Sequence, residues 1–395
     1  MERATTPVIK SVGLRGLRLL HLAAFFSAFD RFVVAPMLLT IALALGAPLA
    51  EVAATASLYY LLYGLMQPVW GMLSDRLGRV RVMRLTLFGA AVAGVLSAVA
   101  PNLTVLIAAR ALAGGLFAAV IPTSLVYIGD TLAVDSRQKA IADLMAATAV
   151  GTALAIVLGG LAASLEAWRL AFAAPALASA ALSVLLTRLP EPEGFDAENR
   201  EGPLIQIRRV LGRRWAMVVV GIALVEGAVI LGFLTFLAPS LESGGFRPAV
   251  AGLAVGLFGL AVLGGTQAVK LVANRLGAST LILIGGGMLV LGCASAAVEQ
   301  SLASVGVAAV LAGGGFAFMH PPLLSWATEV VPEARATVVS LSAAALFAGS
   351  GVATAAVAPL AEAGSFDLLF ALAAVVAVPL GLFAGLARRR YSRMR

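Results

Sequence analysis

Long apolar runs separated by short polar segments dominate the chain from one end to the other. A helix needs about 20 mostly apolar residues to cross the hydrocarbon core of a bilayer. By this criterion the sequence predicts twelve membrane-spanning helices, at about 16–42, 51–73, 82–100, 103–128, 140–164, 169–187, 215–238, 249–271, 279–298, 302–327, 337–360 and 366–387. The pattern therefore indicates an all-α membrane protein with almost every residue in or beside the bilayer.

One polar connection is much longer than the others. Residues 188–214 are rich in Pro, Glu and Arg and separate six predicted spans from six. We therefore expect an N-terminal six-helix half at 1–187, a cytoplasmic linker at 188–214 and a C-terminal six-helix half at 215–395. Apolar residues and arginines are mixed between Leu204 and Trp215, which predicts a short amphipathic helix on the membrane surface. The first apolar run is long enough to span, so we expect a retained helix rather than a cleaved signal peptide.

Charged residues are few and unevenly distributed. They make up 12% of the 395 residues, against about 25% in soluble domains, and the mean hydropathy is +1.00. Of the 28 Lys and Arg residues, Arg169 and Arg247 fall in loops on one side, Arg31 and Arg110 fall within spans, and the rest fall in the two tails, the linker and the loops of the other side. Because cytoplasmic loops carry an excess of Lys and Arg, both termini are predicted to be cytoplasmic in an inner (plasma) membrane protein.

This distribution also explains the net charge of +8. The cations anchor the topology at the lipid bilayer, so we expect no nucleic-acid partner.

Few residues are available for catalytic or metal chemistry. The single Cys293 lies in an apolar run, and the two histidines, His21 and His320, are far apart in the sequence. No Walker-type phosphate loop, His-Glu-x-x-His motif or nucleophile elbow occurs. We therefore expect no enzymatic activity, no cofactor, no metal site and no direct use of ATP.

The sequence contains an internal repeat. A shift of 199 residues places Arg76-Leu77-Gly78 on Arg275-Leu276-Gly277. The same shift pairs Leu112-Ala113-Gly114-Gly115 with Leu311-Ala312-Gly313-Gly314, Phe117-Ala118 with Phe316-Ala317, Pro122 with Pro321, and Asp130 with Glu329. In the second copy Asn274 and Ala278 stand where the first has Asp75 and Arg79. One constant offset across separate stretches predicts two six-helix repeats, with loop charges that differ between them.

The charged loop between the second and third spans has a specific pattern. Its residues are Gly71, Asp75, Arg76, Gly78, Arg79 and Arg81, in the order G-x-x-x-D-R-x-G-R-x-R. A turn this short requires glycine, and the pattern resembles the loop between helices 2 and 3 of the major facilitator superfamily. The resemblance implies a conformational gate made of Gly71, Asp75, Arg76, Gly78 and Arg79 with Asp130, Arg275 and Glu329. It also implies that Asp75 pairs with arginines and with helices 4 and 11 in the outward-open state.

Other stretches support the same resemblance. Trp168-Arg169-x-x-Phe172 is similar to the start of the family's sixth helix, and Val331-Pro332-Glu333-Ala334-Arg335 to its loop between helices 10 and 11. Leu106, Arg110, Gly114 and Ala118, at intervals of four, resemble the helix 4 motif of proton-coupled members. The fifth-helix signature of drug:proton antiporters is incomplete, because Ala155-Ile156 replaces its Gly-Pro pair between Gly151 and Gly159-Gly160. The resemblance implies the major facilitator fold in a twelve-span, drug:proton antiporter-like carrier.

Four ionisable residues fall deep within predicted spans: Asp30, Arg31, Arg110 and Glu226. At about 1.5 Å per residue, Asp30 lies ~20 Å from the inner start of its helix and Arg110 ~10 Å from the outer start of its helix. Asp30 and Arg110 therefore lie at the same depth, where a contact between them is possible. Arg31 lies on a neighbouring face of the first helix. We interpret these residues as the proton-coupling site, in which Asp30 takes up a proton when Arg110 moves away. The alternative is a fixed structural ion pair.

Glu226 is predicted to lie close to the midplane, ~17 Å into its helix at about 1.5 Å per residue, with no cationic residue of the second half at that depth. An unpaired buried glutamate is expected to be protonated for part of a transport cycle, although a hydrogen-bonded structural role is the alternative. His320 lies beside Pro321-Pro322 and is interpreted as a buried neutral histidine at a kink, with a proton relay as the alternative.

Aromatic, methionine and polar residues are candidates for the wall of a substrate cavity. They are Phe26, Phe29, Tyr59, Tyr63, Met66, Gln67, Phe117 and His320. Such walls suit loosely specified amphipathic ligands, while ordinary packing or lipid contact is the alternative for each residue.

The resemblance thus implies a secondary active transporter that works by alternating access and exports small amphipathic or hydrophobic compounds, as in proton-coupled multidrug efflux. We expect a monomer whose partners are a small-molecule substrate and protons. The alternative is a related carrier for a sugar, a metabolite or a lysolipid. Asp30-Arg31-Phe32 also resembles spinster-type lipid transporters, but the Glu they carry after the helix 4 Gly is absent, with Leu116 and Phe117 there instead. A membrane-embedded enzyme or a transport-dead sensor would be a different class of protein. An enzyme needs a convergent catalytic set, and a sensor usually adds a soluble signalling domain; we find neither in the sequence.

Overall fold

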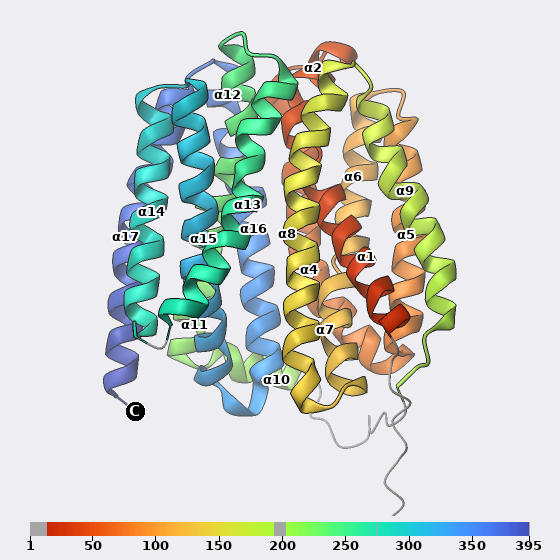
Figure 1. The fold of residues 1–395 in the computed structure, drawn as a ribbon, viewed down its shortest axis with the longest axis vertical. Helices are drawn as coiled ribbons and strands as arrows, with labels where there is room; N and C mark the ends of the chain where they lie inside the picture. The colour runs from red at the N-terminus through yellow and green to blue at the C-terminus, as the bar shows by residue number, and fades with distance from the viewer. Residues whose placement is uncertain (1–13, 193–202, 274, 395) are drawn as a thin grey trace, which may run out of the picture.

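The computed structural model describes residues 14–192, 203–273 and 275–394, and the chain in these ranges is almost entirely helical (Figure 1). The first half contains α1 (Leu14–Phe32), η1 (Ala35–Met37), α2 (Leu38–Leu45), α3 (Leu49–Val52), α4 (Ala54–Leu77), α5 (Arg79–Ala98), α6 (Leu103–Phe117), α7 (Val120–Thr131), α8 (Val134–Ser164), α9 (Trp168–Leu185) and η2 (Leu186–Arg188). The rest contains α10 (Pro203–Leu211), α11 (Arg214–Gly227), the π-helix η3 (Ala228–Gly232), α12 (Leu237–Ser243), α13 (Pro248–Val272), α14 (Ala278–Val298), α15 (Leu302–Val330), η4 (Pro332–Ala334), α16 (Arg335–Glu362) and α17 (Phe366–Arg393).

Twelve helical segments of the described chain are long and apolar enough to cross a membrane. The prediction of an all-α protein with twelve transmembrane helices is therefore confirmed. Part of the predicted linker, 193–202, and Asn274 of the second loop lie outside the described residues.

Several spans are interrupted, which the apolar pattern did not predict. The fourth span breaks between α6 and α7, and the seventh passes through η3 before α12. Proline lacks the amide hydrogen that would bond to the carbonyl four residues earlier. Pro122 therefore leaves the carbonyl of Ala118 without its helical donor at the first break, and Pro239 does the same for Thr235 at the second.

The helices form two groups that face each other (Figure 1). Helices α1 to α9 lie on one side and α11 to α17 on the other, with α8 against α13 and α4 against α16 where the groups meet. Small residues allow these helices to approach closely. A Cβ added to Gly160 of α8 would lie 2.4 Å from the carbonyl oxygen of Pro248, and one added to Gly252 of α13 would lie 3.0 Å from Cα of Gly160.

The two ends of the bundle differ in charge. The turn between α4 and α5, the short helix α10 and the C-terminal end of α17 lie at one end, which we call the arginine-rich end; α2 and α12 lie at the opposite end (Figure 1). The predicted amphipathic helix is present as α10, and Thr337 of α16 donates a hydrogen bond to Gln206 Oε1 of α10 at 2.7 Å.

Candidate functional site

A single residue, Gly78, connects α4 to α5 in the predicted gate loop. Its φ of 103° lies in the region that glycine adopts readily and other residues rarely do. A Cβ at Gly78 would also lie 2.7 Å from the carboxylate of Glu191. That carboxylate accepts hydrogen bonds from the amides of Val80 at 3.0 Å and Arg81 at 3.2 Å, so it satisfies the first turn of α5. Sequence reasoning missed Glu191 because it follows the sixth span, 111 residues beyond Val80.

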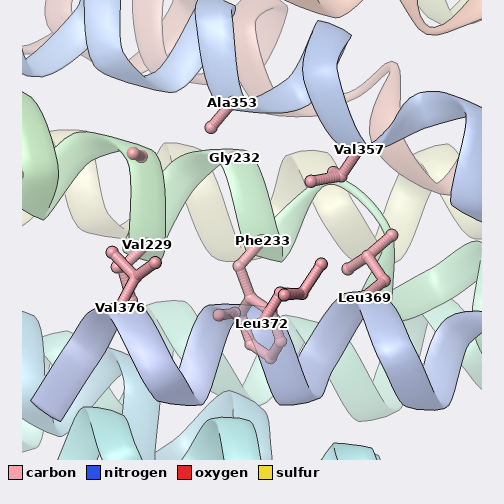
Figure 2. Close-up of a pocket in the computed structure, with 10 residues that line it drawn as sticks. Val229, Gly232, Phe233, Ala353, Val357, Leu369, Leu372 and Val376 are labelled. Carbon is pink, nitrogen blue, oxygen red and sulfur yellow. The ribbon is translucent and has the colours of Figure 1, made fainter.

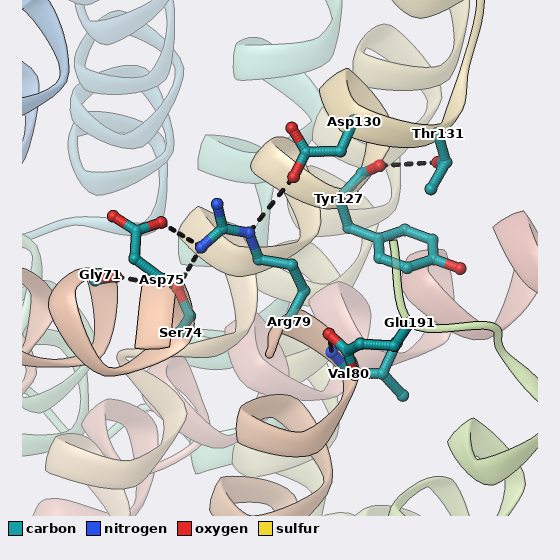
Figure 3. Close-up of polar contacts among 9 residues, drawn as sticks. All are labelled: Gly71, Ser74, Asp75, Arg79, Val80, Tyr127, Asp130, Thr131 and Glu191. Carbon is teal, nitrogen blue, oxygen red and sulfur yellow. Dashed lines mark hydrogen bonds and ion pairs between the residues drawn. The ribbon is translucent and has the colours of Figure 1, made fainter. Parts of the chain in front are cut away.

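Arg79 joins three helices at this turn (Figure 3). Its Nε lies 3.3 Å from Asp130 Oδ2 of α7, while Nη1 donates to Ser74 Oγ at 3.1 Å and to the carboxylate of Asp75 in α4. Three residues of the predicted gate, Asp75, Arg79 and Asp130, are therefore in contact. Arg76 is exposed.

In the second repeat, the counterpart of Asp130 is Glu329, and it forms a different ion pair. Glu329 at the end of α15 accepts a bidentate hydrogen-bond pair from Arg388 of α17, at 2.8 and 3.0 Å. Arg275, which repeats the position of Arg76, is exposed on the connection to α14. The sequence analysis did not single out Arg388, although its place at the end of the last span, ahead of Arg389 and Arg390, was a signal for it.

Asp30 of α1 and Arg110 of α6 form the contact that their depths allowed. Nη1 of Arg110 lies 2.9 and 3.0 Å from the two carboxylate oxygens of Asp30, and Nη2 lies 2.6 Å from its backbone oxygen. The side chains are 1% and 0% exposed. The rings of Tyr59 and Phe172 cover the guanidinium at 4.6 and 4.9 Å. The ion pair is therefore shielded from water.

Arg31 is turned away from that pair. Its guanidinium carbon lies 4.4 Å from the centre of the Tyr63 ring in α4 and 5.1 Å from that of Phe347 in α16. Successive residues of a helix are about 100° apart because 3.6 residues make one turn. Arg31 therefore faces the junction of the two helix groups, while Asp30 faces α6.

Glu226 is not alone, and the prediction that it lacks a partner is wrong. Its Oε2 lies 3.2 Å from Nδ1 of His320 in α15, and the ring of His320 stacks on that of Phe316 with centroids 4.6 Å apart. The Glu226 side chain is fully buried, whereas that of His320 is 29% exposed. The prediction failed because it considered only arginine and lysine as partners of Glu226 and treated His320 as a separate neutral residue.

The predicted cavity residues are mostly interior. Phe29, Tyr59, Tyr63, Gln67 and Phe117 are buried, and Phe26 and Met66 are half-buried. The rings of Tyr59 and Tyr63 stack with centroids 6.1 Å apart, as their shared helix face predicted. Their role as a substrate wall stays a prediction.

An apolar pocket that the sequence did not predict lies elsewhere, where η3 meets α16 and α17 (Figure 2). It is lined by Ala228, Val229, Gly232, Phe233, Ala353, Val357, Leu369, Leu372, Ala373 and Val376. Leu372 and Val376 are also exposed on the outside of the bundle. None of these side chains is polar, so the walls of the pocket suit an apolar group.

Within the described residues, hydrogen bonds bridge the two groups at the end of the bundle opposite the arginine-rich end. The amide of Ala50 in α3 donates to Glu362 Oε2 of α16 at 3.0 Å, and the amide of Ala249 in α13 donates to Ser164 Oγ of α8 at 2.7 Å. The shift of 199 residues that aligns the two halves also places Ala50 on Ala249. The two donors therefore occupy equivalent places in the two repeats, while the acceptors Ser164 and Glu362 are one residue out of register.

Comparison with known proteins relates residues 20–354 to a family described as the Major Facilitator Superfamily. Among curated proteins, a triacylglyceride transporter of Mycolicibacterium hassiacum is 30% identical over 141 residues, which are 35% of this chain and 26% of that protein. The tetracycline resistance protein, class C, of Escherichia coli is 33% identical over 163 residues, 40% of each chain. The chain thus matches about a quarter of the length of the first relative and two fifths of the second.

Solved structures share the whole fold at low identity. A bacterial homologue of the human lysosomal transporter Spinster, inward-facing and unoccupied, superposes with a TM-score of 0.78 at 19% identity, over 96% of this chain and 98% of that one. A peptide transporter, POT, superposes with a TM-score of 0.79 at 16% identity, over 98% and 97%. These similarities concern the fold alone.

Proposed function

Since the chain belongs to the major facilitator superfamily, we propose that it is a proton-coupled exporter of small amphipathic or hydrophobic compounds that works by alternating access. The observation that carries this proposal is the fully buried pair of Asp30 and Arg110. Proteins of this fold move one six-helix half against the other around a central site, and α1 and α6 both belong to the first half.

The pair offers a mechanism for coupling. With Asp30 ionised, Arg110 is held by three hydrogen bonds, and separating them would leave two charges buried without partners at a cost of several kcal/mol. A proton on Asp30 removes the ionic attraction and lets Arg110 turn toward another acceptor. Protonation then favours one arrangement of the halves and deprotonation the other, which requires only a few kcal/mol of differential affinity.

The orientation of the protein follows from its cations. The arginine-rich end is cytoplasmic in this proposal, because Lys and Arg are enriched in cytoplasmic loops. Both termini then lie on the cytoplasmic side of an inner membrane. The bonds from Ala50 to Glu362 and from Ala249 to Ser164 close the outer end. Bonds that join the two halves at the outer end are expected of a carrier closed to the outside, which would take its cargo from the cytoplasm.

Transport by reconstituted protein tests the proposal. Vesicles with an imposed pH gradient are offered a panel of lipophilic cations, sugars and lysolipids. We expect wild type to concentrate amphipathic compounds, and Asp30→Asn to bind them without concentrating them and without the pH dependence of binding. Asp367→Asn, at an exposed carboxylate of α17, is the matched control and should behave as wild type. If Asp30→Asn keeps the wild-type pH profile, the proton is carried elsewhere, with Glu226 as the first candidate.

A lipid carrier is the second candidate. The partial match to triacylglyceride transporters and the wholly apolar pocket beside η3 favour it. Concentration of lysolipids alone from the same panel would support it over the export of amphipathic drugs.

A further inference from the structure

Four buried hydrogen-bond donor groups gather around the stacked rings of Tyr59 and Tyr63. Arg110 lies over Tyr59, and Arg31 over Tyr63. In the described part of the chain, Nε and Nη2 of Arg31, Nε of Arg110 and the hydroxyl of Tyr59 are all buried without a hydrogen-bond partner. Native proteins seldom leave such groups unmatched, because each costs about 1–3 kcal/mol and more when it is charged. A ligand rich in acceptors would satisfy them.

The charges are also unbalanced in one direction. Arg31 and Arg110 are two cations, and Asp30 is the one carboxylate that pairs with either of them within the described ranges. Both of its oxygens are already bonded to Arg110. Arginine keeps its proton at any physiological pH, so Arg31, which is 6% exposed, remains a buried cation without a counter-ion. Its contacts with aromatic rings stabilise the charge but accept none of its N–H groups in the plane of the guanidinium.

The position of Arg31 connects this imbalance to transport. Tyr63 belongs to α4 in the first half and Phe347 to α16 in the second, and their rings are 4.5 Å apart. A group that binds Arg31 therefore touches the junction at which the halves move against each other. A ligand with different contacts in the two states changes their populations.

We infer that Arg31 is the receptor for an anionic head group, such as a carboxylate, sulfonate or phosphate, so that the cargo is an amphipathic anion; this inference rests on the proposed function. The guanidinium donates to two oxygens of the anion in parallel. The rings of Tyr63 and Phe347 pack against the adjoining apolar part of the cargo. The Asp30–Arg110 pair remains available for the proton.

Two probes that differ in one charged group test the inference. They are 8-anilinonaphthalene-1-sulfonate and its uncharged parent, N-phenyl-1-naphthylamine, bound at equilibrium to the full chain in nanodiscs of zwitterionic lipid, with empty nanodiscs as background. Wild type should prefer the sulfonate. Arg31→Met should weaken sulfonate binding at least about tenfold, the loss expected for a charge-assisted hydrogen bond, and leave the uncharged probe unchanged. Arg31→Lys should retain part of the preference, and Arg247→Gln, at an exposed arginine, should retain all of it.

Two results would overturn the inference. One is wild type that binds the sulfonate no more tightly than its parent, which needs no variant and so holds even if Arg31→Met does not fold. The other is a folded Arg31→Met variant with the wild-type ratio of the two affinities. Because these measurements use no pH gradient, they are independent of coupling. Wild type that shows the sulfonate preference but no proton-driven transport would refute the proposed coupling and not the anion site.

Discussion

Neighbouring polar residues in this membrane protein serve different contacts. Asp30 and Arg31 are consecutive in α1, yet Asp30 bonds to α6 and Arg31 packs against α4 and α16. The second half has its own buried carboxylate, Glu226, whose partner is a histidine rather than an arginine. Histidine changes its charge between about pH 5 and 8, whereas arginine does not. The two halves therefore contain buried pairs of different chemistry.

This difference gives a prediction for Glu226. Glu226→Gln keeps an oxygen and an amide next to His320 but cannot take up a proton. We expect the variant to fold and to show less proton uptake per transported molecule than wild type, measured with a pH-sensitive dye inside proteoliposomes. Glu51→Gln, at an exposed carboxylate of the opposite end, should match wild type. Unaltered proton uptake in Glu226→Gln would assign Glu226 a structural role only.

At the scale of secondary structure, the turn between α4 and α5 depends on one glycine. Gly78 has a positive φ and lies against Glu191, whereas Gly71 is within α4 and has open space where a Cβ would be. The same substitution should therefore have opposite effects at the two positions.

We expect Gly78→Ala to destabilise the protein by about 1–3 kcal/mol through backbone strain, because φ 103° and ψ 148° are rarely adopted by residues other than glycine. Displacement of Glu191 from the first turn of α5 should destabilise it further. Gly71→Ala should stabilise α4 by about 0.5–1 kcal/mol, because alanine loses less conformational freedom in a helix. Thermal unfolding of the purified variants in one detergent measures both. Equal melting temperatures for the two variants would show that the turn tolerates a side chain.

At the scale of the whole molecule, the two halves are joined at the opposite end by one hydrogen bond from each repeat. Both donors are amides in the first turn of a helix, which lacks acceptors within its own helix. Both acceptors are side chains of the last residue of a helix, Glu362 in α16 and Ser164 in α8. An outward-open state would have to break both bonds, since each joins one half to the other.

Glu362→Ala should therefore favour opening of this end. A capping hydrogen bond contributes about 0.5–1 kcal/mol in an exposed position, and this corresponds to a roughly two- to fivefold change in the ratio of closed to open molecules. Distances between spin labels placed across this end measure the ratio. Ser164→Ala should add a similar effect independently, and Glu299→Ala, at another exposed carboxylate of this end, should have none. Identical distance distributions in wild type and the double variant would contradict this role.

The sequence by itself determined the features that depend on local composition. The number of spans follows from runs of about 20 apolar residues. The gate pattern around Asp75, Gly78 and Arg79 and the shift of 199 residues are also visible in the sequence alone. Even the contact of Asp30 with Arg110 could be anticipated, because helix rise fixes the depth of each residue in the membrane.

Only the tertiary structure decided which side chains meet across helices. Helix periodicity separates Arg31 from Asp30 by about 100°, but which helix each of them faces depends on the rotation of α1 about its axis. The packing of α15 against α11 brings His320 to Glu226, and the packing of α17 brings Arg388 to Glu329. The bonds to Ala50 and Ala249 depend on how the two halves are docked. Contacts between residues far apart in the sequence leave no periodic signal in it, because their geometry is set by the packing of whole helices.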